Sequence, residues 1–203
     1  MIIGITGGIG SGKSTITNEL AGRGYAVYDC DREAKRIITE DADVLQAVTA
    51  LLGREAFEGG QYNTAYVAKR VFAEPELLQQ LNRIVHPAVK KDILHSFTPS
   101  LLHSFTPLFI ESAILFEAGI DTLCDKIVLV EAPEEVRIAR TIARDYNNDA
   151  SPANINKVRA RIRAQKTSAG TEVLQRYPVL TVVNDGSSVL SRIVDLVCDF
   201  ATH

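Results

Sequence analysis

The sequence predicts an α/β fold in which a parallel sheet of five strands is covered by helices. Five short apolar runs have the length and composition of buried strands, and they occupy residues 2–6, 25–28, 108–110, 126–130 and 180–183. Helical segments alternate with these runs, and such alternation is typical of a parallel sheet. Residues 41–105 contain no convincing strand, so they are predicted to be an all-helical insertion after the second strand.

The boundaries of the helices are marked by glycine and proline, which end helices or occupy their first turn. Helices are expected at residues 14–23 and 31–39, and the last helix is expected to begin near Ser187. The residues that mark the other boundaries are Gly24, Gly59, Gly60, Pro75, Pro133 and Pro152.

Composition is typical of a globular protein with one domain. Of the 203 residues, 46% are hydrophobic and 23% are charged, and the net charge is −3. This balance disfavours a nucleic-acid-binding protein built on a basic surface. No apolar run reaches the ~18 residues that a membrane span requires, and the first residues lack the basic segment of a signal peptide. We therefore expect a cytoplasmic protein with neither a nucleic-acid nor a membrane partner.

Residues 7–14 form a phosphate-binding motif. They read Gly-Gly-Ile-Gly-Ser-Gly-Lys-Ser and match G-x-x-x-x-G-K-[ST] between a predicted strand and a predicted helix. Glycines let the backbone curl so that its N–H groups surround a phosphate, and the helix N-terminus adds positive potential. The motif predicts a three-layer P-loop NTPase fold that binds ATP and Mg²⁺, with Lys13 on the β- and γ-phosphates and the Ser14 hydroxyl on the metal. The residues expected to bind ATP here are Gly8, Gly10, Ser11, Gly12, Lys13, Ser14 and Thr15.

Two carboxylates follow the second predicted strand, at the edge of the sheet where ligands bind in open α/β folds. No Asn-Lys-x-Asp sequence for reading guanine is present, and the chain is short for a motor, so the loop favours a kinase for small molecules. Asp29 or Asp31 can then accept a proton from an attacking hydroxyl or hold Mg²⁺. Asp31 is equally suited to capping a helix that starts at Arg32, and spacing alone does not decide between these roles.

Arginines are concentrated between residues 137 and 163. Arg137, Arg140 and Arg144 share one helical face, and Arg159 and Arg163 lie four apart on the next helix. Arginine binds phosphate oxygens through a fork of N–H donors, so these two helices are predicted to form a lid over the triphosphate. The alternative is a basic face that contacts only solvent.

At these residues the sequence resembles the dephospho-coenzyme A kinase family, and the resemblance covers most of the chain. The segment at 81–87, which ends in His-Pro, and the Gly-Gly-Ile-Gly of the phosphate loop are together far more specific for this family than the phosphate-binding motif alone. The matching segments are the loop at 5–15, the acidic pair at 29 and 31, Leu-Asn-Arg-Ile-Val-His-Pro at 81–87, Leu-Phe-Glu at 115–117, Arg-Asp at 144–145, Arg-Ile-Arg-Ala-Gln at 161–165 and Asn-Asp-Gly at 184–186.

The resemblance implies that ATP phosphorylates the ribose 3′-hydroxyl of dephospho-coenzyme A, giving coenzyme A and ADP. It implies that Asp31 is the general base and that Lys13 and Arg140 act on the phosphates, with Arg144 and Asn184 as further ATP contacts. The residues it assigns to the acceptor are Asn82, His86, Leu115, Glu117 and Arg163. The single domain would comprise a nucleotide-binding core (1–40, 106–136, 166–203), an acceptor-binding insertion (41–105) and a lid (137–165).

The sequence departs from the family pattern at two places. The family's Asp-x-Pro is Glu111-Ser112-Ala113 here, and the pair before the late turn is Val179-Leu180 in place of Ala-Asp. A tandem copy of His-Ser-Phe-Thr-Pro at 95–99 and 103–107 is interpreted as a local duplication without function. Two alternatives remain at this stage: another small-molecule or nucleoside kinase on the same fold, and a regulatory protein that binds nucleotide without efficient turnover.

Overall fold

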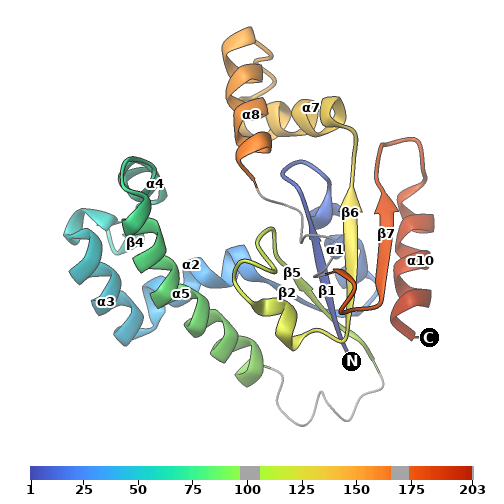
Figure 1. The fold of residues 1–203 in the computed structure, drawn as a ribbon, viewed down its shortest axis with the longest axis horizontal. Coiled ribbons are helices and arrows are strands. Elements are labelled where there is room, and N and C mark those ends of the chain that lie inside the picture. Colours follow the sequence, from blue (N-terminus) through green and yellow to red (C-terminus); the bar gives the residue numbers. More distant parts are fainter. Residues whose placement is uncertain (97–105, 166–173, 203) are drawn as a thin grey trace. The chain divides into compact units, whose positions relative to one another are not determined.

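The computed structural model describes residues 1–96, 106–165 and 174–202, and these divide into two compact units (Figure 1). The first unit, Met1–Tyr28 with Phe105–His203, contains the main sheet, and the second, Asp29–Ser104, is mainly helical. Most of the tandem His-Ser-Phe-Thr-Pro copy lies outside the described residues. No helix in the described part of the chain is both long and apolar enough to cross a membrane.

The main sheet has five strands in the order β2-β5-β1-β6-β7. The pairings of β1 with β5 and β6, and of β6 with β7, are parallel. The predicted fold class is therefore confirmed, and each strand lies within one or two residues of its predicted place. The strands are β1 (Ile2–Gly7), β2 (Ala26–Asp29), β5 (Leu108–Glu111), β6 (Lys126–Glu131) and β7 (Val179–Val183).

The register places the carboxyl ends of the central strands side by side. Ile5 of β1 pairs with Glu111 of β5, and Gly7 pairs with Val130 of β6. Because β1 is central, its side chains Ile3 and Ile5 are completely buried, and each contributes about 1.5–3 kcal/mol by leaving water. The phosphate loop therefore starts from a rigid strand and lies beside the ends of β5 and β6.

Two helices pack on the sheet. α1 (Lys13–Gly22) contacts β1, β5 and the C-terminal helix α10 (Leu190–Thr202), which also contacts β7. α10 begins three residues after the predicted Ser187 because a polar turn precedes it. The Asp185 carboxylate accepts hydrogen bonds from the Ser187 N–H (2.8 Å) and hydroxyl (2.6 Å), so this segment is a side-chain-stabilised turn.

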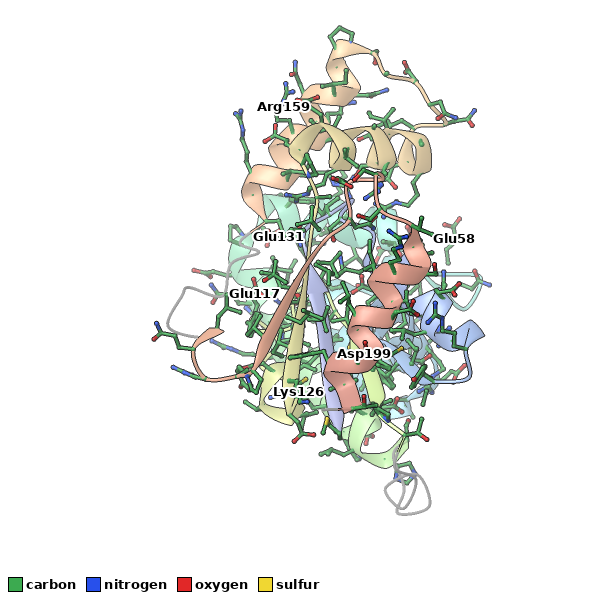
Figure 2. All side chains as sticks on the ribbon, turned by 90° about the vertical axis from the view of Figure 1, so that its right-hand side faces the viewer. Glu58, Glu117, Lys126, Glu131, Arg159 and Asp199 are labelled. Carbon is green, nitrogen blue, oxygen red and sulfur yellow. The ribbon has the colours of Figure 1, made fainter. Side chains whose placement is uncertain are left out.

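A helical hairpin, α7 (Glu134–Asp145) and α8 (Pro152–Ala164), follows the carboxyl end of β6. In Figure 2, Lys126 and Glu131 mark the two ends of β6, and Arg159 of α8 lies beyond the Glu131 end. Proline stands just before α7 and at the first position of α8, as predicted. The two helices share a buried apolar cluster made of Ile138, Ile142, Val158 and Ile162.

The second unit consists mainly of helices, among which α2, α3 and α5 pack on one another. α5 begins at Pro75, as expected of proline at a first helical position, and continues through Pro87. Buried apolar side chains lie on one face of α5 at helical spacing, from Leu77 to Ile93. The helices are α2 (Cys30–Glu40), α3 (Ala42–Leu52), α4 (Thr64–Ala73) and α5 (Pro75–Ser96).

The expectation that residues 41–105 contain no strand is wrong at one place. β3 (Phe57–Glu58) and β4 (Gln61–Tyr62) form a small antiparallel hairpin. Its turn residues, Gly59 and Gly60, have φ of 58° and 82°, the left-handed values that two-residue hairpin turns favour. Strands of two residues show no alternating pattern, so the pair of glycines was the only signal in the sequence.

Candidate active site

The phosphate loop curls as its glycines predict. Gly10 and Gly12 have φ of 75° and 93°, and Gly12 caps the N-terminus of α1. Ser11 N–H donates to the Gly8 carbonyl (3.1 Å), and Lys13 Nζ donates to the Gly7 carbonyl (3.1 Å). The loop thus brings the predicted ATP-binding residues together ahead of the positive end of α1, which suits an anion.

Glu111 lies against this loop from the end of β5. Its Oε1 accepts a hydrogen bond from the Ser14 hydroxyl (2.7 Å), and its Oε2 accepts one from the Thr17 hydroxyl (2.6 Å). Only 8% of Glu111 is exposed, so its carboxylate is satisfied by these two hydroxyls of α1. Sequence reasoning left the role of Glu111 open, and the one signal was an acidic residue closing the strand before a small-residue segment.

A hydroxyl and a carboxylate in contact are chemically suited to Mg²⁺, which binds oxygen ligands and keeps several waters and phosphate oxygens. The described residues hold no group of three or more His, Cys, Asp or Glu side chains that would bind a metal by itself. An ion at this loop would therefore rely on Ser14, Glu111 and phosphate oxygens together.

Arg140 and Asn184 cover the loop near Ser11. Arg140 Nη1 donates to the carbonyls of Ser11 (3.2 Å) and Asn184 (2.9 Å), and its Nη2 donates to Asn184 Oδ1 (3.2 Å). Asn184 Nδ2 in turn donates to the Ser11 carbonyl (3.1 Å), and Asn184 is buried. A Cβ on Gly12 would lie 2.1 Å from Asn184 Nδ2, so glycine is needed there for packing as well as for its φ.

Two further side chains reach the loop from the helical hairpin. Arg137 Nε donates to the Ile9 carbonyl (2.8 Å), and Gln165 Oε1 accepts from the Ile9 N–H (2.7 Å). Gln165 Nε2 also donates to the Ala113 carbonyl (3.3 Å). Neither residue was singled out from the sequence as a loop contact. Arg137 is 128 positions from Ile9 in the sequence and Gln165 is 156 positions away, so only the fold brings them together.

The remaining arginines of the hairpin form ion pairs. Arg144 Nε and Arg161 Nη1 donate to Asp145 (2.7 and 2.8 Å), and Arg159 Nε donates to Glu134 (2.9 Å). The hydrogen bond from Arg144, with that from Arg161, lowers the pKa of Asp145 to about 2. The pairs of Arg161 and Arg159 tie α8 to α7, and the roles predicted for Arg144 and for the exposed Arg163 stay predictions.

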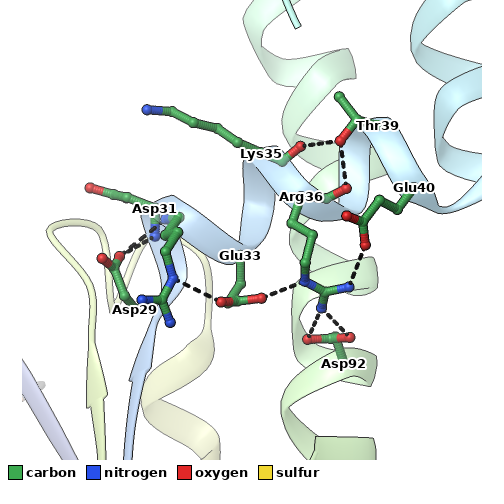
Figure 3. A network of polar contacts seen from close by, with 9 residues as sticks. Asp29, Asp31, Glu33, Lys35, Arg36, Thr39, Glu40 and Asp92 are labelled. Atoms are coloured by element: carbon green, nitrogen blue, oxygen red, sulfur yellow. Dashed lines mark hydrogen bonds and ion pairs between the residues drawn. The ribbon is translucent and has the colours of Figure 1, made fainter. Parts of the chain in front are cut away.

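In the second unit, Asp29 caps α2. Its Oδ1 accepts from the N–H groups of Asp31 (3.0 Å) and Arg32 (3.1 Å), and the helix begins at Cys30 (Figure 3). The interpretation of Asp31 as the cap is therefore wrong, because Asp29 already satisfies those donors. Asp31 is an exposed residue in the first turn of α2, and Figure 3 shows its carboxylate directed away from Glu33 and Arg36.

Ion pairs of Arg36 hold α2 on α5. Its Nη2 donates to both carboxylate oxygens of Asp92 (2.9 Å each), and its Nη1 donates to Glu40 (3.2 Å). Hydrogen bonding to Arg36, and then to Arg32, keeps the pKa of Glu33 below its usual value. Charge-assisted hydrogen bonds of this kind are stronger than neutral ones, so the pair with Asp92 holds the helix that carries Asp31 on α5.

Asn82 and His86 lie on α5 four residues apart, and both are half-buried. Burial, with a smaller effect of Lys90, lowers the pKa of His86, so its imidazole is neutral at pH 7 and can both donate and accept hydrogen bonds. The predicted acceptor role of these two residues stays a prediction.

The segment after β5 carries two of the residues expected to contact the acceptor, Leu115 and Glu117. Leu115 is completely buried, and a Cβ on Gly4 would come within 2.8 Å of its Cδ2. Its side chain therefore belongs to the core of the first unit, and the contact with the acceptor expected for Leu115 stays a prediction. Glu117 is exposed, and nothing in its surroundings tests the role expected for it.

Comparison with known proteins identifies the family. The family model for dephospho-CoA kinase matches residues 1–195. A dephospho-CoA kinase of Bacteroides fragilis is 35% identical over 96% of this chain and 90% of its own length. One of Porphyromonas gingivalis is 44% identical over 70% of this chain and 69% of its own.

Solved structures agree in fold. A crystal structure of a Thermus thermophilus protein has a TM-score of 0.76 and 34% identity, and the match covers 100% of this chain and 98% of that one. A dephospho-CoA kinase of Campylobacter jejuni has a TM-score of 0.66 at 20% identity over 98% and 96% of the two chains. From the family match over nearly its whole length, we conclude that this chain belongs to the dephospho-CoA kinase family.

Proposed function

We propose that this chain transfers the γ-phosphoryl group of ATP to the ribose 3′-hydroxyl of dephospho-coenzyme A, giving coenzyme A and ADP. The observation that carries the proposal is the assembled phosphate loop, with Arg140 and Asn184 hydrogen-bonded onto it, in a member of this family. Phosphoryl transfer requires mainly positioning and charge stabilisation, and these residues supply both.

Each residue has one task in this scheme. The loop N–H groups and Lys13 bind the β- and γ-phosphates, and Arg140 supplies positive charge where negative charge develops. Asp31 orients the attacking hydroxyl and takes its proton, while Asp29 caps α2. Ser14 and Glu111 would hold Mg²⁺, which neutralises phosphate charge when bound. Arg144 and Arg163 would contact phosphates or acceptor from the hairpin, and Asn82, His86 and Glu117 would contact the acceptor.

A screen of acceptors tests this function. ADP release from ATP is measured with dephospho-coenzyme A, uridine, shikimate and nucleoside monophosphates at equal concentration. We expect acceptor-dependent ADP release with dephospho-coenzyme A alone. A faster reaction with another acceptor would assign a different small-molecule kinase, and ATP binding without turnover for any acceptor would assign a nucleotide-binding regulator.

Substitution of Glu111 tests the site expected for Mg²⁺. Glu111→Gln replaces the carboxylate near Ser14 and Thr17 by an uncharged amide of the same shape. Because the negative charge is lost, we expect the Mg²⁺ concentration for half-maximal activity to rise about tenfold or more. Glu131→Gln, at the exposed end of β6 on the other side of β1, is the control and should behave as the parent. Activity titrated with Mg²⁺ at saturating ATP gives the result, and an unchanged requirement in Glu111→Gln would remove Glu111 from the metal site.

Substitution of Asn82 and His86 tests the acceptor site. In the double variant Asn82→Ala with His86→Ala, we expect the KM for dephospho-coenzyme A to rise about tenfold or more, because two half-buried polar groups are lost, while the KM for ATP stays the same. Gln79→Ala, an exposed change on the same helix, is the control. Initial rates with each substrate varied in turn check this, and equal increases in both KM values would indicate a folding defect and refute the assignment.

A further inference from the structure

Ile9, in the middle of the phosphate loop, contacts the α7–α8 hairpin through its side chain, its carbonyl and its N–H. Its side chain packs against the buried cluster that contains Ile138 and Val158. Its carbonyl accepts from Arg137 at the start of α7 (2.8 Å), and its N–H donates to Gln165 at the end of α8 (2.7 Å). Side chain and peptide groups of one loop residue are therefore all fixed by the hairpin.

Arg137 occupies this place at an energetic cost. Its Nη2 is buried and has no hydrogen-bond partner within the described part of the chain, and burial lowers its pKa, with partial compensation by Glu134. Arg137 as a whole is half-buried, but a buried N–H donor of a charged group that lacks an acceptor costs free energy. Within the described ranges, the hydrogen bond that this guanidinium makes is the one to the loop carbonyl of Ile9.

The same guanidinium explains the second glycine of the loop. A Cβ on Gly8 would lie 2.1 Å from Arg137 Nη2 and 2.6 Å from its Cζ. Gly8 does not have the left-handed φ of Gly10 and Gly12, so its backbone would accept alanine. The three atoms nearest to such a Cβ all belong to the guanidinium of Arg137, which would have to move away from the Ile9 carbonyl to make room for it.

We propose that Arg137 and Gln165 are positioning residues that, together with Ile9, lock the phosphate loop to the α7–α8 hairpin in the conformation that binds nucleotide phosphates. They act through the loop backbone, because one orients the carbonyl and the other the N–H of Ile9, and these two atoms set the peptide planes on either side of it. The inference rests on the proposed function only in that the loop is the ATP site. It assigns the α7–α8 hairpin the role of holding the phosphate loop in shape, which is separate from the predicted role of these helices as a lid over the triphosphate.

Direct binding measurements separate this inference from the function itself. The dissociation constant of ADP is measured by calorimetry without acceptor, and the melting temperature is recorded for each variant. Arg137→Met keeps the apolar stem and removes the charged donor, so we expect ADP to bind about tenfold more weakly, as for loss of a hydrogen bond from a charged group. Ile155→Ala, which removes packing from the same apolar cluster and keeps the two side chains that hydrogen-bond to Ile9, should lower the melting temperature and leave the ADP dissociation constant unchanged.

Gly8 supplies a double-mutant test. Gly8→Ala should weaken ADP binding about as much as Arg137→Met, and the combined variant should be no weaker than Arg137→Met alone, because the Cβ then meets no guanidinium. Additive losses, or unchanged affinity in Arg137→Met, would overturn the inference. Turnover of dephospho-coenzyme A by the parent is recorded separately. If the parent does not show this activity, the ADP-binding results still test the inference.

Gln165 provides the second pair of variants if Gly8→Ala fails to fold. Gln165→Glu keeps an acceptor for the Ile9 N–H and loses the donor to the Ala113 carbonyl, whereas Gln165→Met loses both. We expect the ADP affinity of Gln165→Glu to be near that of the parent. We expect the affinity of Gln165→Met to be about threefold to tenfold weaker, because this variant also loses the neutral hydrogen bond to the Ile9 N–H. Equal affinity in Gln165→Met and the parent would overturn the role of this residue.

Discussion

Lys13→Met is expected to abolish most turnover and to weaken ATP binding, while the fold survives. Lys13 is the side chain of the loop that is predicted to lie on the β- and γ-phosphates. Methionine keeps most of its length and apolar stem but removes the charge that stabilises the transferring group. Loss of one such preorganised donor costs about 10²–10³-fold in kcat, and we expect at least this. The measurements are steady-state rates with dephospho-coenzyme A and calorimetry with ATP.

Lys126→Met is the matched control for Lys13. Lys126 lies at the opposite end of β6 from the hairpin (Figure 2), where its Nζ donates to the Phe200 carbonyl (2.8 Å). This variant should lose some stability and keep its activity. Normal ATP affinity and normal turnover in Lys13→Met would show that the loop is not the nucleotide site.

Asp31→Asn is expected to fold and bind ATP like the parent and to lose at least ~10²-fold in kcat. A positioned general base contributes ~10²–10⁴-fold, although in a loose transition state the orientation of the hydroxyl contributes as well. Stability should hold because Asp29, not Asp31, accepts the first N–H groups of α2. Melting curves, ATP-binding isotherms and a coupled ADP assay give the three quantities.

Asp29→Ala is the companion variant. It removes the observed cap, so the free energy of unfolding should fall by about 0.5–2 kcal/mol, whereas Asp31→Asn should leave it unchanged. Near-parental turnover in Asp31→Asn would exclude Asp31 as the base.

Much of the fold could be predicted because strands of a parallel sheet are buried on both faces and read as continuous apolar runs. β1 and β6 show this, and the proline residues just before α7 and at the first position of α8 marked helix starts. The β3–β4 hairpin was missed because two-residue strands have no period. The start of α10 was misplaced because the Asp185 side chain, rather than an apolar pattern, determines the preceding turn.

The candidate site divides in the same way. The loop from Gly7 to Ser14 was predictable because its chemistry is contiguous in sequence. The contact between Ser14 and Glu111 was not, because it depends on the register that sets Ile5 of β1 opposite Glu111 of β5. Spacing could not show which of Asp29 and Asp31 caps the helix, since both carboxylates lie near its start, and a family segment could not show that Leu115 is buried.

Transfer of label from γ-³²P ATP tests the central claim most directly. The chain is incubated with ATP, Mg²⁺ and either dephospho-coenzyme A or its analogue without the ribose 3′-hydroxyl. We predict that label enters dephospho-coenzyme A in one-to-one ratio with ADP, that a 3′-nucleotidase removes it, and that the analogue receives none. Label in the analogue, or ADP formation without any labelled coenzyme A, would contradict phosphorylation of the 3′-hydroxyl.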